Sequence, residues 1–305
     1  MQATNNILLI RPAKFGFNTQ TESSNAFQNK VDETPEELIK KVNKEFELFA
    51  STLISKGINV LIINDTEFPA KPDAIFPNNW ISFHSDGTVV LYPMNAVNRQ
   101  AERRLDILEK LKEQYLISRI LDFSHFEKQN KFLEGTGSII FDHDNKIAYA
   151  CISTRTNKEL FLNVCEQLYY NAICFSSYDE NGMEIYHTNV MMCIAEKFAV
   201  ICLESITDKI ERDFVIKSLE SSGHTIIEIS LDQVKNFAGN MLELKNLTGK
   251  SYLVMSASAD DSLTQLQKDS IIKFSEIVPL NVSTIENTGG GSVRCMIAEV
   301  FLPNL

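Results

Sequence analysis

The sequence predicts an α/β fold made of five repeated units of about 50 residues that close into a ring. A helix followed directly by a short strand recurs five times. Hairpins with tips near residues 86, 144, 196 and 248 separate these pairs. The last β segment, Val293–Leu302, is free to pair with the first, Ile7–Arg11. Repeats whose apolar faces are covered only by neighbours form rings or stacks, and pairing of the two chain ends favours a ring. The alternative is an ordinary two-domain α/β protein with accidental spacing.

The first helix carries the strongest start signal, with Thr34 as N-cap, Pro35 in the first turn and Glu37 three residues after the cap. It is predicted to end at Gly57 and to lead into the strand Ile58–Ile63. The other helix–strand pairs are predicted at 97–115 with 117–121, 156–171 with 172–175, 207–222 with 225–229, and 262–275 with 277–282. The hairpins are predicted at 80–92, which turns at an Asp-Gly pair, and at 138–151, 190–203 and 241–255.

Composition is typical of a globular protein, with 305 residues, 44% hydrophobic and 23% charged. We expect one domain over residues 1–305. The 29 basic and 40 acidic residues give a net charge of -11, which argues against nucleic acid as a partner. No apolar stretch is long enough to span a membrane, and no signal peptide is present, so no membrane partner is expected. Six cysteines without C-x-x-C spacing predict a reducing, cytoplasmic location. The five histidines lack metal-ligand spacing, so neither a metal nor another cofactor is expected.

Three reactive side chains occupy the starts of different hairpins, at corresponding positions of the repeat: Glu134, His187 and Cys295. In a ring, these positions point towards the central axis and can meet. A thiol, an imidazole and a carboxylate together supply a nucleophile, a proton carrier and an orienting group. Each also has a plain structural interpretation, as a core cysteine, a structural histidine and a turn-capping glutamate.

The motifs at these positions resemble those of the guanidine-modifying superfamily, which includes arginine deiminase, dimethylarginine dimethylaminohydrolase and the amidinotransferases. The resemblance extends over nearly the whole chain and is nearest to the citrulline utilization hydrolase (CtlX) group. It implies a five-bladed α/β propeller, the pentein fold, with pseudo-fivefold symmetry. The motifs that carry it are Arg11-Pro12, Asp73 to Trp80, Leu133-Glu134-Gly135, Ser153 to Asn157, His187-Thr188-Asn189 and Gly289 to Met296.

The resemblance also implies roles for individual residues. Cys295 would attack the carbon of a guanidine-type group, and His187 would protonate the leaving amine and then activate water. Glu134 would hold the histidine or the substrate nitrogens. Arg155 matches a residue that clamps the substrate carboxylate, and Arg99 looks like a second clamp, with a solvated helix-start arginine as the alternative.

Departures from the family pattern bear on the substrate. Asp73 is retained, but Asn79 and Asn189 stand where related enzymes carry carboxylates. A guanidinium offers only donors and a positive charge, whereas a ureido group has a carbonyl that an amide N–H can satisfy. The amides therefore favour a neutral ureido substrate, although Asp73 and Glu134 could still hold a guanidinium.

We therefore expect a hydrolase that acts on a C–N bond of a ureido- or guanidino-bearing amino acid, with citrulline preferred. The alternatives are an arginine or methylarginine deiminase or dihydrolase and a non-catalytic propeller that binds an amino acid. A small amino acid is the expected partner, and a homodimer is left open.

Overall fold

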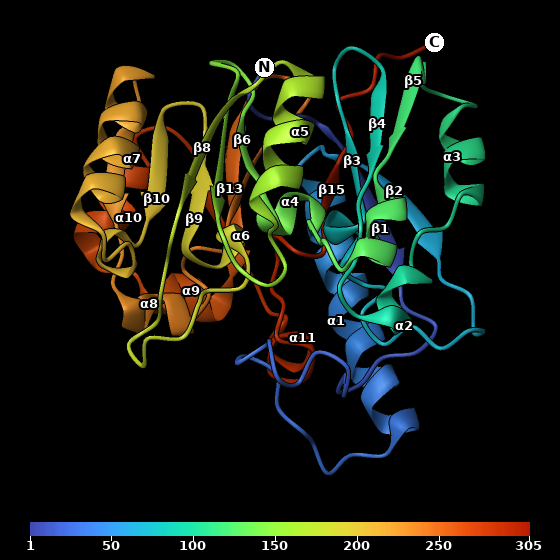
Figure 1. Ribbon diagram of the computed structural model, residues 1–305. Coiled ribbons are helices and arrows are strands. Elements are labelled where there is room, and N and C mark those ends of the chain that lie inside the picture. Colours follow the sequence, from blue (N-terminus) through green and yellow to red (C-terminus); the bar gives the residue numbers. More distant parts are fainter.

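The computed structural model describes all residues, 1–305, and forms five three-stranded sheets arranged in a ring (Figure 1). In every sheet the middle strand pairs antiparallel with one neighbour and parallel with the other. The sheet orders are β15-β1-β2, β3-β4-β5, β6-β7-β8, β9-β10-β11 and β12-β13-β14. The five-bladed α/β propeller expected from the sequence is confirmed. The strands are β1 (Asn6–Arg11), β2 (Asn59–Asn64), β3 (Ile81–Phe83), β4 (Thr88–Leu91), β5 (Arg119–Asp122), β6 (Ile140–Asp142), β7 (Ile147–Cys151), β8 (Asn171–Phe175), β9 (Met192–Ile194), β10 (Phe198–Ile201), β11 (Thr225–Glu228), β12 (Leu242–Lys245), β13 (Ser251–Ser256), β14 (Glu276–Leu280) and β15 (Ala298–Glu299).

Helices connect the middle strand of each sheet to its parallel partner. Figure 1 shows α3 and α7 at opposite outer edges of the molecule, with strands between them. The helices are α1 (Pro35–Ser55), α2 (Val97–Gln100), α3 (Asp106–Leu111), α4 (Gly135–Ser138), α5 (Lys158–Leu168), α6 (Thr188–Met191), α7 (Lys209–Ser221), α8 (Leu231–Lys235), α9 (Ala257–Ser262), α10 (Gln265–Ile271) and α11 (Ser283–Gly289), with the 3-10 turns η1 (Pro77–Asn79), η2 (Ser124–Gln129) and η3 (Leu203–Ser205).

The two ends of the chain complete one sheet together. β15 pairs antiparallel with β1, with Ile7 opposite Glu299. Both termini accordingly lie at the same end of the molecule in Figure 1. β15 also contacts β3, and β9 contacts both β6 and β12. The strands that follow the hairpin starts therefore face one another across the ring.

The first helix forms as its sequence predicts. The Thr34 hydroxyl accepts from the Glu37 backbone N–H, and the Glu37 carboxylate accepts from the Thr34 N–H, which is a complete capping box. The apolar stripe that includes Val42 and Phe46 is buried in the same core cluster as Ile7 of β1. Burial of this stripe fixes α1 against the sheet that joins the chain ends.

Two predicted elements differ from the structure. The helix expected over 97–115 is split into α2 and α3, and Arg99 of α2 and Glu102 of the following turn are both buried. The strand expected over Val293–Leu302 is reduced to β15. The residues before it form tight turns, in which the Cys295 N–H donates to the Ser292 carbonyl over 2.9 Å. In both places a predicted helix or strand is interrupted where polar or reactive side chains are buried.

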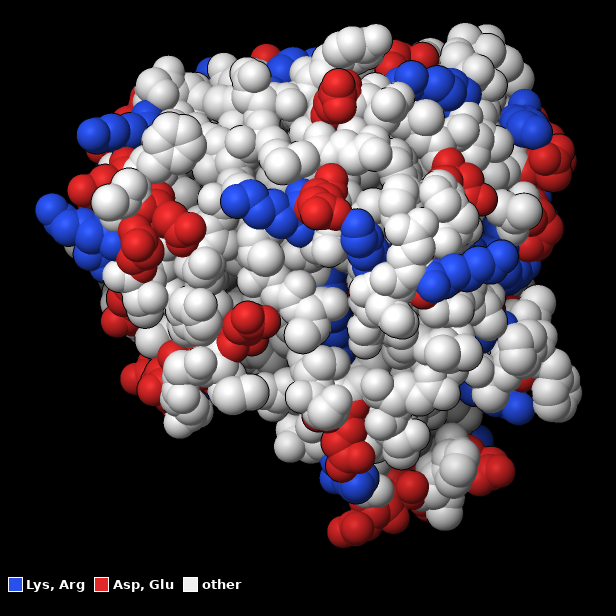
Figure 2. Space-filling view, viewed as in Figure 1, with Lys and Arg blue, Asp and Glu red and all other residues white.

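The surface is mixed in charge. Acidic and basic side chains are interspersed over the face shown in Figure 2. No helix is both long enough and apolar enough to cross a membrane.

Candidate active site

Short helical turns bring the hairpin starts together at the axis. η1, α4 and α6 each lead directly into a strand that faces the axis, namely β3, β6 and β9. α4 contacts both η1 and α6. The repeat position that the sequence singled out is therefore a real point of convergence.

His187 and Glu134 form a buried pair at this point. The imidazole Nε2 lies 2.7 Å from Glu134 Oε2, and the other carboxylate oxygen accepts from the Asn95 N–H over 2.9 Å. Neither residue is more than 3% exposed. A carboxylate that accepts at Nε2 fixes the tautomer with the proton on Nε2. Nδ1 has no hydrogen-bond partner in the protein and is free to exchange a proton with a ligand.

Burial and charge set the protonation of this pair. Burial lowers the pKa of His187 to about 4, although Glu134 acts in the opposite direction. Burial alone would raise the pKa of Glu134, but the Arg155 guanidinium and the hydrogen bond to His187 hold it far below its usual range. Near neutral pH the structure therefore contains a neutral imidazole oriented by an ionised carboxylate.

Cys295 lies beneath the glycine-rich turn and is 7% exposed. Its Sγ accepts from the side-chain Nδ2 of Asn189 and of Asn240, each over 3.3 Å. The structure thus places Asn189 under the thiol rather than in the wall of the adjacent cavity. Asn240 was not singled out from the sequence, although it ends a segment in the same repeat position as Asn79 and Asn189.

A small cavity of about 20 Å³ lies between the nucleophile candidate and the imidazole. It has room for about one water molecule. Its walls include six of the eight sequence-predicted site residues: Asp73, Asn79, Arg99, Arg155, His187 and Cys295. Glu134 stands behind His187, and Asn189 stands behind Cys295.

The segment 18–28, here called the covering segment, closes this cavity. Asn18 donates to Asp73 Oδ2 over 2.7 Å, and the Ser24 hydroxyl accepts from Arg155 Nη2 over 2.6 Å. Asn25 donates to the Gly289 carbonyl over 3.2 Å. An amino acid is much larger than this cavity, and these contacts of the covering segment border it.

Arg99 orients the Asn79 amide. Its Nη1 donates to Asn79 Oδ1 over 2.9 Å, while Nε and Nη2 engage Glu102 over 2.9 and 3.0 Å. The guanidinium is 3% exposed, so the solvated alternative for Arg99 does not hold. With its fork occupied by Glu102, Arg99 is placed to position Asn79 rather than to clamp a substrate carboxylate.

Two buried polar atoms of the cavity walls have no partner. Asn79 Nδ2 and Asp73 Oδ1 make no hydrogen bond. A Cβ added at Gly137 would lie 2.4 Å from Asn79 Nδ2 and 2.9 Å from His187 Nδ1, so only glycine allows these two nitrogens to lie so close to the backbone. Burial raises the pKa of Asp73, against the opposing effect of Arg99. The cavity therefore offers one unmet donor and one unmet acceptor.

The Arg155 guanidinium, by contrast, has partners within the protein. It is 2% exposed, stacks over the Tyr186 ring at 4.7 Å and lies 3.6 Å from Glu134. Its contact to Ser24 is the one that motion of the covering segment would release. The freed N–H groups could then donate to an anionic group.

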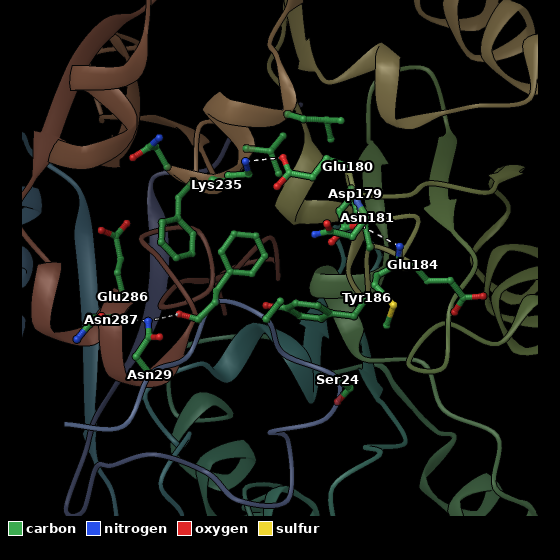
Figure 3. A pocket seen from close by; sticks show the side chains of 18 of the residues that line it. Ser24, Asn29, Asp179, Glu180, Asn181, Glu184, Tyr186, Lys235, Glu286 and Asn287 are labelled. Atoms are coloured by element: carbon green, nitrogen blue, oxygen red, sulfur yellow. Dashed lines mark hydrogen bonds and ion pairs between the residues drawn. The ribbon is translucent and has the colours of Figure 1, made fainter. Parts of the chain in front are cut away.

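A larger cleft, of about 1470 Å³, lies on the other side of the covering segment. Figure 3 shows Glu180, Glu184 and Glu286 around it, with Lys235 paired to Glu180. Tyr186 lines both the cleft and the small cavity. Ser24 lines the cleft and accepts a hydrogen bond from Arg155, which lines the cavity. The cleft and the small cavity are therefore adjacent. No group of three or more His, Cys, Asp or Glu side chains is arranged to hold a metal ion.

Comparison with known proteins assigns the family. The family model described as N,N dimethylarginine dimethylhydrolase, eukaryotic, matches residues 11–302. A sequence comparison with curated proteins finds no match. Among solved structures, the substrate-bound N-terminal domain of ArgZ, an arginine dihydrolase from cyanobacteria, has a TM-score of 0.75 at 15% identity, with 98% of this chain and 99% of that chain covered.

Two further structures share the fold. Unliganded AgrE has a TM-score of 0.74 at 16% identity, and the match covers 98% of this chain but 39% of AgrE. The dimethylarginine hydrolase DDAH from Pseudomonas aeruginosa, in complex with citrulline, has a TM-score of 0.68 at 14% identity, with 97% and 99% of the two chains covered. These likenesses agree with the five-bladed architecture. The chain belongs to the N,N-dimethylarginine dimethylhydrolase family, whose members hydrolyse C–N bonds of amidine groups.

Proposed function

We propose that the protein hydrolyses the ureido group of citrulline and that it groups, within its family, with the citrulline utilization hydrolases. Citrulline and water would give ornithine and carbamic acid, and carbamic acid decomposes to ammonia and carbon dioxide. The coarser activity, hydrolysis of a guanidino-type group, is that of the family. The substrate and the roles of individual residues are the proposal.

The unmet polar atoms of the cavity support this substrate. Arg99 holds the Asn79 oxygen, so the amide must present its Nδ2 donor to the cavity. Asp73 presents the unpaired acceptor Oδ1. A ureido group has a carbonyl for the donor and N–H groups for the acceptor, whereas a guanidinium has N–H groups alone. A buried donor left unpaired costs about 1–3 kcal/mol, which disfavours the guanidinium.

The remaining residues supply a covalent mechanism. The Cys295 Sγ attacks the ureido carbon, and its proton passes to Nδ1 of the neutral His187. His187 then gives this proton to the leaving amine, and the bond between carbon and that nitrogen breaks. Nδ1 of His187 then takes a proton from water, which attacks the carbon of the S-carbamoyl intermediate, and returns that proton to the departing sulfur, so that carbamic acid and the free thiol form. Glu134 stabilises the imidazolium that forms in between.

Arginine or a methylated arginine is the second candidate. The family model carries the name of dimethylarginine hydrolysis, and ArgZ is an arginine dihydrolase. Asp73 and Glu134 are carboxylates that a guanidinium could use, and the outer cleft is rich in carboxylates. A non-catalytic propeller that binds an amino acid is the third candidate.

Incubation of the purified protein with citrulline, arginine and dimethylarginine separates these candidates. We expect ammonia and ornithine in equal amounts from citrulline, at a higher kcat/KM than for either guanidino compound. Ornithine and ammonia in a 1:2 ratio from arginine, at the higher kcat/KM, would establish arginine dihydrolysis instead. Binding of an amino acid without ammonia release would establish the non-catalytic alternative.

Asn79→Asp is expected to shift preference from citrulline towards arginine. The new carboxylate still pairs with Arg99, but it replaces the N–H donor by an acceptor. We expect the ratio of kcat/KM for arginine to that for citrulline to rise at least about tenfold, since mismatched polar groups in buried sites discriminate strongly. Asn189→Asp is a poorer test, because its carboxylate would lie against Cys295 Sγ. An unchanged ratio in Asn79→Asp would refute the ureido argument.

Arg155→Ala is expected to raise KM for citrulline about tenfold or more, because a substrate carboxylate would lose a forked partner. Ser24→Ala is the matched control, since it removes the covering-segment contact to Arg155 and leaves the guanidinium in place. We expect this control to keep KM within about threefold of the wild type. Steady-state kinetics on both variants provide the measurement. Equal KM values for Arg155→Ala and the wild type would show that Arg155 does not bind the carboxylate.

A further inference from the structure

We infer that Asn240 is a catalytic residue that stabilises the negative charge on Cys295 Sγ, together with Asn189, as the thiol loses its proton and again when the thiolate is expelled. This inference rests on the proposed role of Cys295 as nucleophile. It assigns a chemical task to the residue that precedes β12, whose sheet contributes none of the site residues predicted from the sequence.

The Asn240 amide has its orientation fixed by the backbone. Its Oδ1 accepts from the Arg294 N–H over 3.0 Å, and one Nδ2 hydrogen is directed to the Asn189 carbonyl over 3.0 Å. The second Nδ2 hydrogen is then directed to Cys295 Sγ at 3.3 Å, while Oδ1 lies farther from the sulfur, at 3.7 Å, where it can accept from the thiol. The side chain is 1% exposed. A flipped amide would bring its oxygen against the Asn189 carbonyl and its NH₂ against the Arg294 N–H, so the donor must face the sulfur.

The turn that carries Asn240 is built for this close approach. Gly239 lies so near α6 that an added Cβ would be 2.2 Å from the Val190 carbonyl oxygen. Phe237 adopts a left-handed backbone conformation with φ of 60°, and its carbonyl accepts from the Asn240 N–H over 2.8 Å. The turn before β12 therefore packs directly on α6. This contact places the Asn240 side chain against both the Asn189 carbonyl and Cys295 Sγ.

Two N–H donors on one sulfur favour the thiolate over the thiol. A thiol sulfur is a weak acceptor, whereas a thiolate accepts strongly, and hydrogen bonds to charged groups are the stronger kind. His187 cannot supply a resting positive charge to the sulfur, because burial lowers the pKa of the imidazole to about 4. The amides are then the groups in direct contact with Sγ that stabilise its charge while the proton moves to His187.

The test is the pH dependence of alkylation of Cys295 by iodoacetamide, measured without substrate by mass spectrometry of the peptide that contains it. In Asn240→Ala, we expect the pH of half-maximal alkylation rate to rise by about one unit, the effect of losing one hydrogen bond to a charged group. Asn240→Asp keeps the acceptor for the Arg294 N–H and replaces the donor by a carboxylate, so its shift should be larger. In both variants kcat should fall at least about tenfold.

Asn236→Ala is the matched control, since Asn236 lies in the same turn, is exposed and bonds only to the Asp232 carbonyl. It should leave the alkylation profile and kcat at wild-type values. An unchanged alkylation midpoint in both Asn240 variants would overturn the inference, even if their thermal stability falls. That result leaves the nucleophile untouched, because loss of the proposed function would show instead as full activity in Cys295→Ser.

Discussion

Cys295→Ser is expected to reduce kcat at least about a thousandfold, since a serine hydroxyl is a far weaker nucleophile than a thiolate near neutral pH. The two amide donors and His187 remain in place, so the loss would measure the sulfur itself. The measurement is ammonia release from citrulline under saturating conditions, with circular dichroism to confirm the fold. In the wild type, mass spectrometry during turnover should show a covalent adduct on Cys295.

Cys202→Ser is the control for this prediction. Cys202 is fully buried in the largest hydrophobic cluster, away from the catalytic cavity, and burial raises the pKa of its thiol to about 11. The serine should lower thermal stability and leave kcat within about twofold. Full activity of Cys295→Ser, or an adduct on another cysteine, would end the covalent mechanism.

The fold could be predicted because it repeats. One helix with a clear capping box and four hairpins at similar spacing were enough to indicate five units, and the pairing of β1 with β15 followed from the unpaired segments at the chain ends. The element bounds were less predictable. α2 and α3 replace one helix, and β15 is two residues long, because tertiary contacts of Arg99 and of the Cys295 turn override local propensity.

The candidate catalytic groups could also be located, since repeat position predicts that Glu134, His187 and Cys295 lie close together. What the sequence could not show is which way each polar side chain points. Asn189, predicted to contact substrate, donates to the sulfur, and Arg99 donates to Asn79. These contacts join residues far apart in the chain and depend on single rotamers. The single-domain bounds, the cytoplasmic location and a homodimer stay predictions.

The covering segment carried no sequence signal at all. It has no periodicity, and its contacts to Asp73, Arg155 and Gly289 use asparagine and serine side chains that are ordinary for a loop. Repeat register could have identified Asn240, by contrast, because it ends a hairpin-start segment just as Asn189 does. The polar residues at the hairpin starts therefore predict the site together with the reactive residues there.

His187→Ala is expected to lower kcat by roughly 100 to 10,000-fold, the usual contribution of a group that transfers protons in the transition state.

The pH profile of the wild type tests whether His187 is the group that accepts the proton. Burial lowers the pKa of His187 to about 4, so the imidazole is neutral above about pH 5, and kcat/KM should fall only as the pH drops below that value. Glu134 raises this pKa against the effect of burial. Glu134→Gln should therefore move the acidic limb to still lower pH while it reduces the plateau rate. The profiles are measured from pH 2.5 to pH 8, with circular dichroism at each pH to confirm the fold. An acidic limb centred near pH 6.5 in the wild type, or one that moves to higher pH in Glu134→Gln, would show that a neutral, buried His187 is not the group that accepts the proton.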